Sequence, residues 1–299
     1  MPVHTPYDGS SPAFTIGLSS IDPREWIEVD ARLDEYLAEK ERLWRSCAER
    51  EFVAEAGSEP RQQEVLDLLI AYLPQRFPET HQLIGNCMHI GARTVDVRDD
   101  TLPALRRGAR LVQEDLILMR KTADGWRLAA GSLSFPSSWH LLEKFGKTMP
   151  QIHAPVPGFG AGSRNIALVE RMFDYLRPQH IFVRFNWGLY DGPALHHPAP
   201  GNGMRRLGAD GDTSQIHLRV ERQTLRKLSR SGDILFAIRT HLDPFDTLAR
   251  HPDGAALARS LHGQISELSA VQLAYKGLSE ERARLLARLA QIAGPELDS

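Results

Sequence analysis

The stretch FPSSWHLLEKFGKTMPQIHAPVPG occupies residues 135–158 and lies between two groups of predicted strands. Ser137 and Ser138 are of a residue type that caps helix N-termini, and Gly146 is of a type that ends helices. The stretch therefore predicts a turn, a short helix and then a loop. Because regular strands flank it on both sides, this helical insertion decides how the rest of the fold is interpreted.

The second half of the stretch places His153 among three prolines. Pro150, Pro155 and Pro157 each fix φ, so they predict a stiff, extended loop around the histidine. Such a loop loses little further conformational entropy when it becomes ordered. A histidine held in this way is a candidate ligand or acid/base group, although a purely structural role is the alternative.

The periodicity of the chain predicts an α+β fold built on an antiparallel sheet. An Asp-Gly turn at 122–125 joins the first two strands into a hairpin. The strands are predicted at 111–121, 126–135, 181–190, 216–225 and 234–240. Helices are predicted at 30–53, 60–73, 163–176, 255–275 and 279–292. No structure or function is assigned to 79–103.

The 299 residues are predicted to form one main domain. Residues 1–20 are rich in Pro, Gly and Ser and predict a loose arm on the surface. The main domain then spans 21–250, and the segment 251–299 is a helical extension packed on it.

Composition excludes several classes of partner and site. The net charge of −2 gives no electrostatic reason to expect nucleic acid or a membrane surface, and no apolar run spans a bilayer. We therefore expect a cytoplasmic protein. Cys47 and Cys87 show no ligand spacing, which argues against a disulfide, a zinc cage or an iron–sulfur cluster on this chain.

Charged and polar side chains follow one face of the strand predicted at 216–225. Arg219 and Glu221 alternate with Leu218 and Val220, so the polar pair shares one side of the sheet. A solvated sheet face is one explanation, and a polar wall of a binding site is the other. Arg184 and Asn186 share a face of the strand predicted at 181–190, and Arg239 lies on the strand predicted at 234–240. Each of these three residues could form a structural salt bridge or contact a ligand.

Several short motifs in a fixed order resemble one known family. They are Val112-Gln113-Glu114-Asp115-Leu116, Phe135-Pro136-Ser137 with Trp139, Glu143-Lys144-x-Gly146, Ile152-His153-x-Pro155-Val156-Pro157, Arg184-x-Asn186-Trp187, Arg219-Val220-Glu221-Arg222-Gln223-Thr224-Leu225 and Phe236-x-Ile238-Arg239-Thr240. Together they span roughly residues 18–275 and resemble the alpha subunits of haem (heme)-dependent oxidative N-demethylases. The resemblance implies a PAS-like antiparallel sheet whose face lines a haem cavity.

The resemblance also implies roles for individual residues. His153 becomes the expected iron ligand, with His140 on the preceding helix as the competing candidate. Arg219 and Glu221 become candidate catalytic residues, the first toward dioxygen or a propionate and the second toward a protonated amine. Further candidates for cofactor binding are Arg184, Asn186 and Arg239.

The implied function is oxidative N-demethylation of a small secondary or methylated amine, such as dimethylamine, by the haem-binding subunit of an NADPH-dependent monooxygenase. FMN, a 2Fe-2S cluster, NADPH and tetrahydrofolate are then expected on partner subunits that transfer electrons or accept the one-carbon product. Two alternatives stay open: a non-catalytic haem-binding gas or redox sensor, and a haem-free interaction module. The sequence does not identify the amine.

Overall fold

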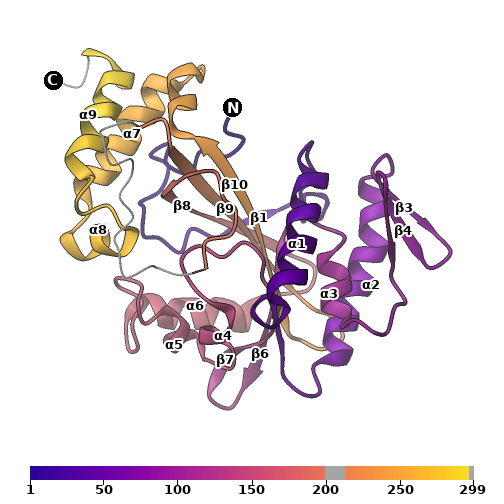
Figure 1. Ribbon diagram of the computed structural model, residues 1–299. Helices are drawn as coiled ribbons and strands as arrows, with labels where there is room; N and C mark the ends of the chain where they lie inside the picture. Colours follow the sequence, from indigo (N-terminus) through magenta and orange to yellow (C-terminus); the bar gives the residue numbers. More distant parts are fainter. Residues whose placement is uncertain (199–212, 296–299) are drawn as a thin grey trace.

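The computed structural model describes residues 1–198 and 213–295, which surround one seven-stranded antiparallel sheet (Figure 1). Its strands lie in the order β1-β8-β9-β10-β6-β7-β2. They are β1 (Ser19–Ile21), β2 (Phe52–Ala54), β6 (Asp115–Thr122), β7 (Gly125–Ser132), β8 (Ile181–Asp191), β9 (Ile216–Lys227) and β10 (Ile234–Pro244). The predicted α+β fold with an antiparallel sheet is confirmed, and its PAS-like identity remains a prediction.

The predicted hairpin lies between β10 and the edge strand β2. β6 and β7 pair from Leu116 with Ser132 to Thr122 with Gly125. Gly125 has φ of 108°, a left-handed conformation that glycine adopts without a Cβ clash. β9 and β10 then pair along their whole length, so β9 lies inside the sheet between β8 and β10. This position buries the polar row of β9.

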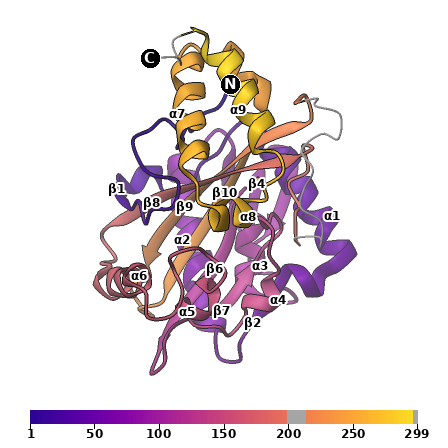
Figure 2. The ribbon, with the colours of Figure 1, turned by 90° about the vertical axis from the view of Figure 1, so that its left-hand side faces the viewer.

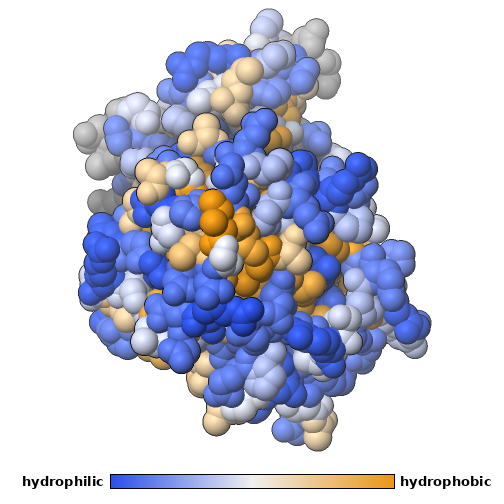
Figure 3. Space-filling view, turned by 90° about the vertical axis from the view of Figure 1, so that its right-hand side faces the viewer, coloured by the Kyte–Doolittle hydropathy of each residue, from blue (hydrophilic) through white to orange (hydrophobic). Residues whose placement is uncertain are grey.

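Helices and a small second sheet cover one face of the large sheet (Figure 1). The helices are α1 (Leu33–Glu51), α2 (Glu59–Arg76) and α3 (Ala104–Ala109), and the second sheet contains β3 (His81–Ile84), β4 (Cys87–Ile90) and β5 (Arg93–Asp96). Residues 79–103, to which the sequence assigned no structure, thus contain three short strands. Figure 3 looks onto this side, where a hydrophilic surface surrounds an apolar area.

Three shorter elements cover part of the other face. They are α4 (Leu141–Lys144), α5 (Met149–His153) and α6 (Arg164–Tyr175). Ile117 and Leu225 of the sheet share a core with Ile166 and Phe173 of α6. The predicted helix at 163–176 is therefore confirmed. It packs on the face of the sheet opposite to α1–α3.

The C-terminal helices pack on β8 and β9 (Figure 2). After the short 3₁₀ helices η1 (Pro23–Glu25) and η2 (Phe245–Arg250), the remaining elements are α7 (Gly254–Glu267), α8 (Ala270–Lys276) and α9 (Arg282–Ala293). The helix predicted at 255–275 is two helices, because Ser269 caps a new N-terminus by accepting from the N–H of Gln272.

The prediction of a loose N-terminal arm is wrong. Tyr7 is fully buried in the core that the C-terminal helices form with β8 and β9. Residues Ser19–Ile21 pair with β8, and Ile16 and Leu18 pack against the apolar residues around α5 and α6. The prolines and glycines of this segment favour irregular backbone. The apolar side chains between them nevertheless pack against the rest of the protein.

The stiff loop predicted around His153 is also different in the structure. His153 ends the five-residue helix α5, which begins after Thr148. Pro150 lies in the first turn, where a missing N–H costs nothing, and Thr148 and Gln151 form a capping box. The proline that predicted extended backbone therefore starts a helix.

Candidate functional site

A cavity of about 230 Å³ lies between the sheet and helices α4–α6. Apolar side chains from both sides form most of its wall, among them Ile117, Leu225, Met149, Phe159 and Phe173. The N-terminal segment closes it through Ala13–Leu18, and Tyr275 of α8 contributes from the C-terminal helices. The cavity is thus assembled from four parts of the chain that are distant in sequence.

His153 lines this cavity from the helical side. Its Nδ1 lies 2.9 Å from the carbonyl oxygen of Met149, one turn earlier, so Nδ1 carries the proton that donates to it. Nε2 then carries the lone pair, which is the arrangement of a metal-binding histidine. Burial lowers the pKa of His153 to about 4, so the ring is neutral near pH 7.

His140, the competing ligand candidate, does not line the cavity. It is the N-cap residue of α4 and has extended backbone geometry. Of the two candidate histidines, His153 is therefore the one that lines the cavity.

Glu221 lines the same cavity from the sheet and is 6 % exposed. It lies opposite Asn186 in the pairing of β8 with β9. Its carboxylate accepts hydrogen bonds from the Ser137 hydroxyl, from Asn186 Nδ2 at 3.3 Å and from Gln223 Nε2 at 2.8 Å. All three donors are neutral, so the negative charge is oriented without being neutralised.

Arg184 lines the cavity beside this group. It donates to Gln223 Oε1 at 2.6 Å and to the carbonyl oxygens of Thr15 and Ile16 at 3.3 and 3.1 Å. These bonds fasten the N-terminal segment to the sheet, a role that the sequence did not predict. Burial lowers the pKa of Arg184, although the guanidinium stays charged at any ordinary pH.

Arg219 is directed at the residues that follow β7 and does not line the cavity. It donates to the Phe135 carbonyl oxygen at 2.7 Å, to Leu195 at 2.9 Å and to Ser137 Oγ at 2.7 Å. Ser137 in turn donates to Glu221. The predicted direct contact of Arg219 with a ligand is thus replaced by a chain of hydrogen bonds that positions Glu221.

The backbone beside Ser137 is unusual. Ser138 has φ of 65°, and it is the one non-glycine residue with positive φ in the ranges 1–198 and 213–295. Residues held in sparsely populated conformations concentrate at functional sites. Here the conformation accompanies the turn that directs Ser137 toward Glu221.

Arg239 lies on the opposite face of the sheet and does not line the cavity with the other predicted cofactor-binding residues. Ile238 lines the cavity, and adjacent strand residues point to opposite faces. Arg239 instead donates to Asp30 at 2.6 Å and lies 4.1 Å from the centre of the Tyr36 ring. Motif membership suggested a site role, whereas strand alternation already indicated the opposite side.

Lys144 and Tyr275 also line the cavity, and the sequence gave no role to either. The Lys144 ammonium lies 4.1 Å from the centre of the Trp139 ring. Burial lowers the pKa of Lys144 to about 8, and burial together with the nearby Glu221 carboxylate raises that of Tyr275 to about 12. Lys144 belongs to a motif that the sequence showed, but the position of Tyr275 depends on how α8 packs.

Comparison with known families agrees with this geometry. Residues 17–286 match the family described as haem-dependent oxidative N-demethylase, alpha subunit-like. The chain belongs to this family. The matched range includes every residue named above as lining the cavity from the sheet and from α4–α8.

In this haem-dependent oxidative N-demethylase alpha subunit-like chain, the lining of the cavity is chemically compatible with a haem. It offers one neutral imidazole whose free nitrogen can bind iron, with apolar walls suited to a porphyrin. Lys144 and Arg184 add positive charge to the lining of the cavity. Among the described helices, none has the length and apolar character needed to cross a bilayer.

Proposed function

We propose that this chain is the haem-binding catalytic subunit of a monooxygenase that removes a methyl group from a small secondary or methylated amine of the dimethylamine type. The family relationship supports the reaction class. The observation that carries the proposal is a neutral histidine and a carboxylate held in one apolar cavity, the histidine on α5 and the carboxylate on β9.

His153 would hold the haem iron, since its Nδ1 is already bonded to the Met149 carbonyl oxygen. Arg184 and Lys144 would bind the propionates, because both cations line the cavity and neither has a carboxylate within 4.0 Å in the described residues. When bound, the haem supplies the oxygen-activating redox chemistry. The chain itself contributes the ligand, the charge balance and the exclusion of water.

Glu221 would bind the substrate. It is the one carboxylate among the residues that line the cavity in the described part of the chain, and a protonated amine is costly to bury without such a partner. Asn186 and Gln223 keep the carboxylate oriented through their amide groups. Preorganised charge in a dry cavity interacts more strongly than it would in water.

The overall reaction needs two electrons from outside the chain. A methylamine, dioxygen, two electrons and two protons give the demethylated amine, formaldehyde and water. Cys47 and Cys87 are both free cysteines, and we expect NADPH, FMN and a 2Fe-2S cluster on partner subunits. Tetrahydrofolate would accept the one-carbon product there.

The proposal is tested by reconstituting the chain with haem and measuring the Soret spectrum. His153→Ala should lose stoichiometric haem or its native spectrum, whereas the matched control His140→Ala should keep both. When the electron-transfer subunits and dimethylamine are added, one NADPH should be consumed for each formaldehyde released. Haem binding without amine-dependent turnover would instead support the sensor alternative, and an unchanged spectrum of His153→Ala would contradict the ligand assignment.

A further inference from the structure

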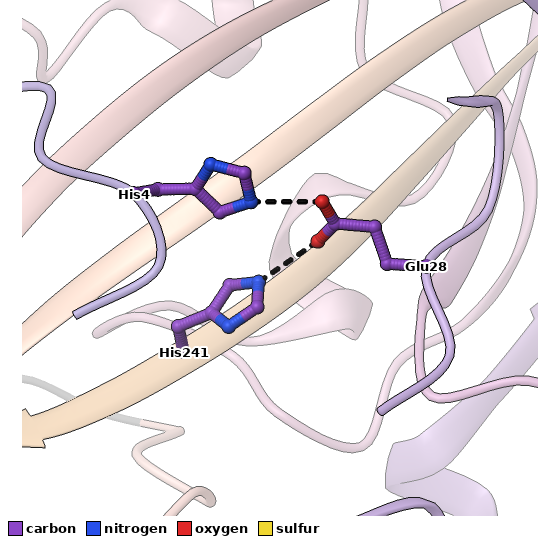
Figure 4. Close-up of side chains that lie close together, drawn as sticks. All are labelled: His4, Glu28 and His241. Carbon is purple, nitrogen blue, oxygen red and sulfur yellow. Dashed lines mark hydrogen bonds and ion pairs between the residues drawn. The ribbon is translucent and has the colours of Figure 1, made fainter. Parts of the chain in front are cut away.

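Two histidines and a glutamate meet at a second place, outside the cavity (Figure 4). His4 comes from the N-terminal segment, Glu28 from the segment before α1, and His241 from β10. His4 Nε2 lies 2.8 Å from Glu28 Oε1, and His241 Nε2 lies 3.0 Å from Glu28 Oε2. None of the three side chains lines the haem cavity.

The three side chains are largely withdrawn from solvent. Their exposed fractions are 20 % for His4, 25 % for Glu28 and 11 % for His241. The possible ligand atoms all lie within 4.8 Å of one another. Figure 4 shows the two rings turned toward different oxygens of the same carboxylate, so their nitrogens converge on one small volume.

We propose that His4, Glu28 and His241 bind a divalent transition-metal ion of the zinc class. Two imidazole nitrogens and one carboxylate are a ligand set that zinc accepts, with a fourth position left for water. Metal–ligand bonds of about 2.1 Å in a tetrahedron separate ligand atoms by about 3.3 to 3.4 Å. The observed nitrogen–oxygen separations of 2.8 and 3.0 Å lie a few tenths of an ångström below this value, and all the candidate ligand atoms lie within 4.8 Å of one another, so small side-chain adjustments would bring them to one ion.

The surrounding charges permit a cation here. Arg222 Nε lies 3.2 Å from Glu28 Oε1, which is the nearest competing positive charge. Glu28 Oε2 faces His241, and the buried carboxylate of Glu114 accepts from the Glu28 backbone N–H at 2.9 Å. Arg239 is already paired with Asp30 at 2.6 Å.

A metal at this position would join three segments that are distant in sequence. His4 precedes the buried Tyr7 and the residues Ala13–Leu18 that close the haem cavity. Because zinc has no redox chemistry, its role would be to hold the N-terminal segment on the sheet. This anchoring role, which follows from the three separate segments that supply the ligands, is distinct from the proposed amine chemistry.

The test uses the untagged full chain, treated with a chelator, dialysed against zinc and then against metal-free buffer. Zinc content is measured by mass spectrometry, and affinity by competition with a chromophoric chelator. The wild type should hold one zinc per chain. His4→Ala and Glu28→Gln should each weaken zinc binding by at least about tenfold, whereas the exposed His180→Ala should not change it.

Haem content separates this proposal from the one above. Loss of zinc in Glu28→Gln with an unchanged Soret spectrum is expected, and Glu28→Gln keeps the size and acceptor oxygen of the original side chain. Circular dichroism confirms folding of both variants. A wild type that retains no zinc, or equal zinc binding in wild type, His4→Ala and Glu28→Gln, would overturn the proposal.

Discussion

The two faces of the central sheet carry similar charged residues but use them differently. On the face toward α1–α3, opposite charges pair directly, as Arg239 does with Asp30 at 2.6 Å and Arg222 with Glu28 at 3.2 Å. On the cavity face, none of Lys144, Arg184 and Glu221 has an oppositely charged side chain within 4.0 Å in the described residues. One face therefore uses charge for packing, and the other leaves it available to a ligand.

The physical difference is the cavity. A buried ion pair compensates desolvation only when both partners are present and well placed. Glu221 instead accepts bonds from neutral groups, and Lys144 lies against an aromatic ring. The following changes test whether the two faces really separate stability from ligand binding.

Arg239→Leu should give the largest effect, and it should act on stability. The arginine is 1 % exposed, and its removal leaves Asp30 and nearby carboxylates without their cation. We expect the free energy of unfolding to fall by roughly 3 kcal/mol. Urea denaturation of the haem-free chain measures it, and haem affinity of the folded variant should stay unchanged. If Arg239→Leu kept the native stability but lost haem, Arg239 would serve ligand binding and not stability, contrary to this prediction.

Glu221→Gln should act on catalysis instead. The amide keeps the shape of the side chain but removes the charge that would pair with the ammonium, so kcat/KM for the amine should fall by about 10- to 100-fold. Thr224→Val is a matched control on the same strand, since Thr224 is buried on the other face. The activity of both variants is measured as amine-dependent formaldehyde release. A similar loss of activity in the two would show that the substitutions act by disturbing the strand and not by removing the charge of Glu221.

Ser137→Ala should have a smaller effect. The hydroxyl joins Arg219 to Glu221, while Arg219 keeps its bonds to the carbonyl oxygens of Phe135 and Leu195. Loss of this one link should lower kcat/KM severalfold and cost about 1 kcal/mol of stability. Kinetics and denaturation of the same preparation check it. A loss as large as that of Glu221→Gln would mean that Ser137 has a direct role.

The pH dependence of haem binding should show the smallest effect. Burial lowers the pKa of Lys144 to about 8, so its positive charge is present below pH 8 and is lost as the pH rises above it. Haem affinity should therefore fall by a factor of roughly 2 to 5 between pH 7 and pH 9. Spectroscopic titration measures this, and Lys144→Met should remove the dependence. If Lys144→Met kept the full pH dependence of haem affinity, another titratable group would be responsible for that dependence.

Local patterns predicted much of the sheet and of the site. Alternation placed Arg184 with Asn186 on one face of β8 and Glu221 on the polar face of β9, and the structure brings all three to the cavity. In β10 the structure places Ile238 in the cavity wall, so the adjacent Arg239 points to the other face of the sheet. Pro150 was misinterpreted because a proline fits both an extended loop and the first turn of a helix.

The sequence by itself determined five strands of the large sheet, β6 to β10, together with the α+β class and the polar face of β9, because these depend on periods of two and on residues close in the chain. Only the tertiary structure decided that His153 and not His140 lines the cavity, that residues 13–18 close it, and that Tyr275 reaches it. It also brought His4, Glu28 and His241 together. Contacts between distant segments depend on how whole elements pack, and no local pattern encodes them.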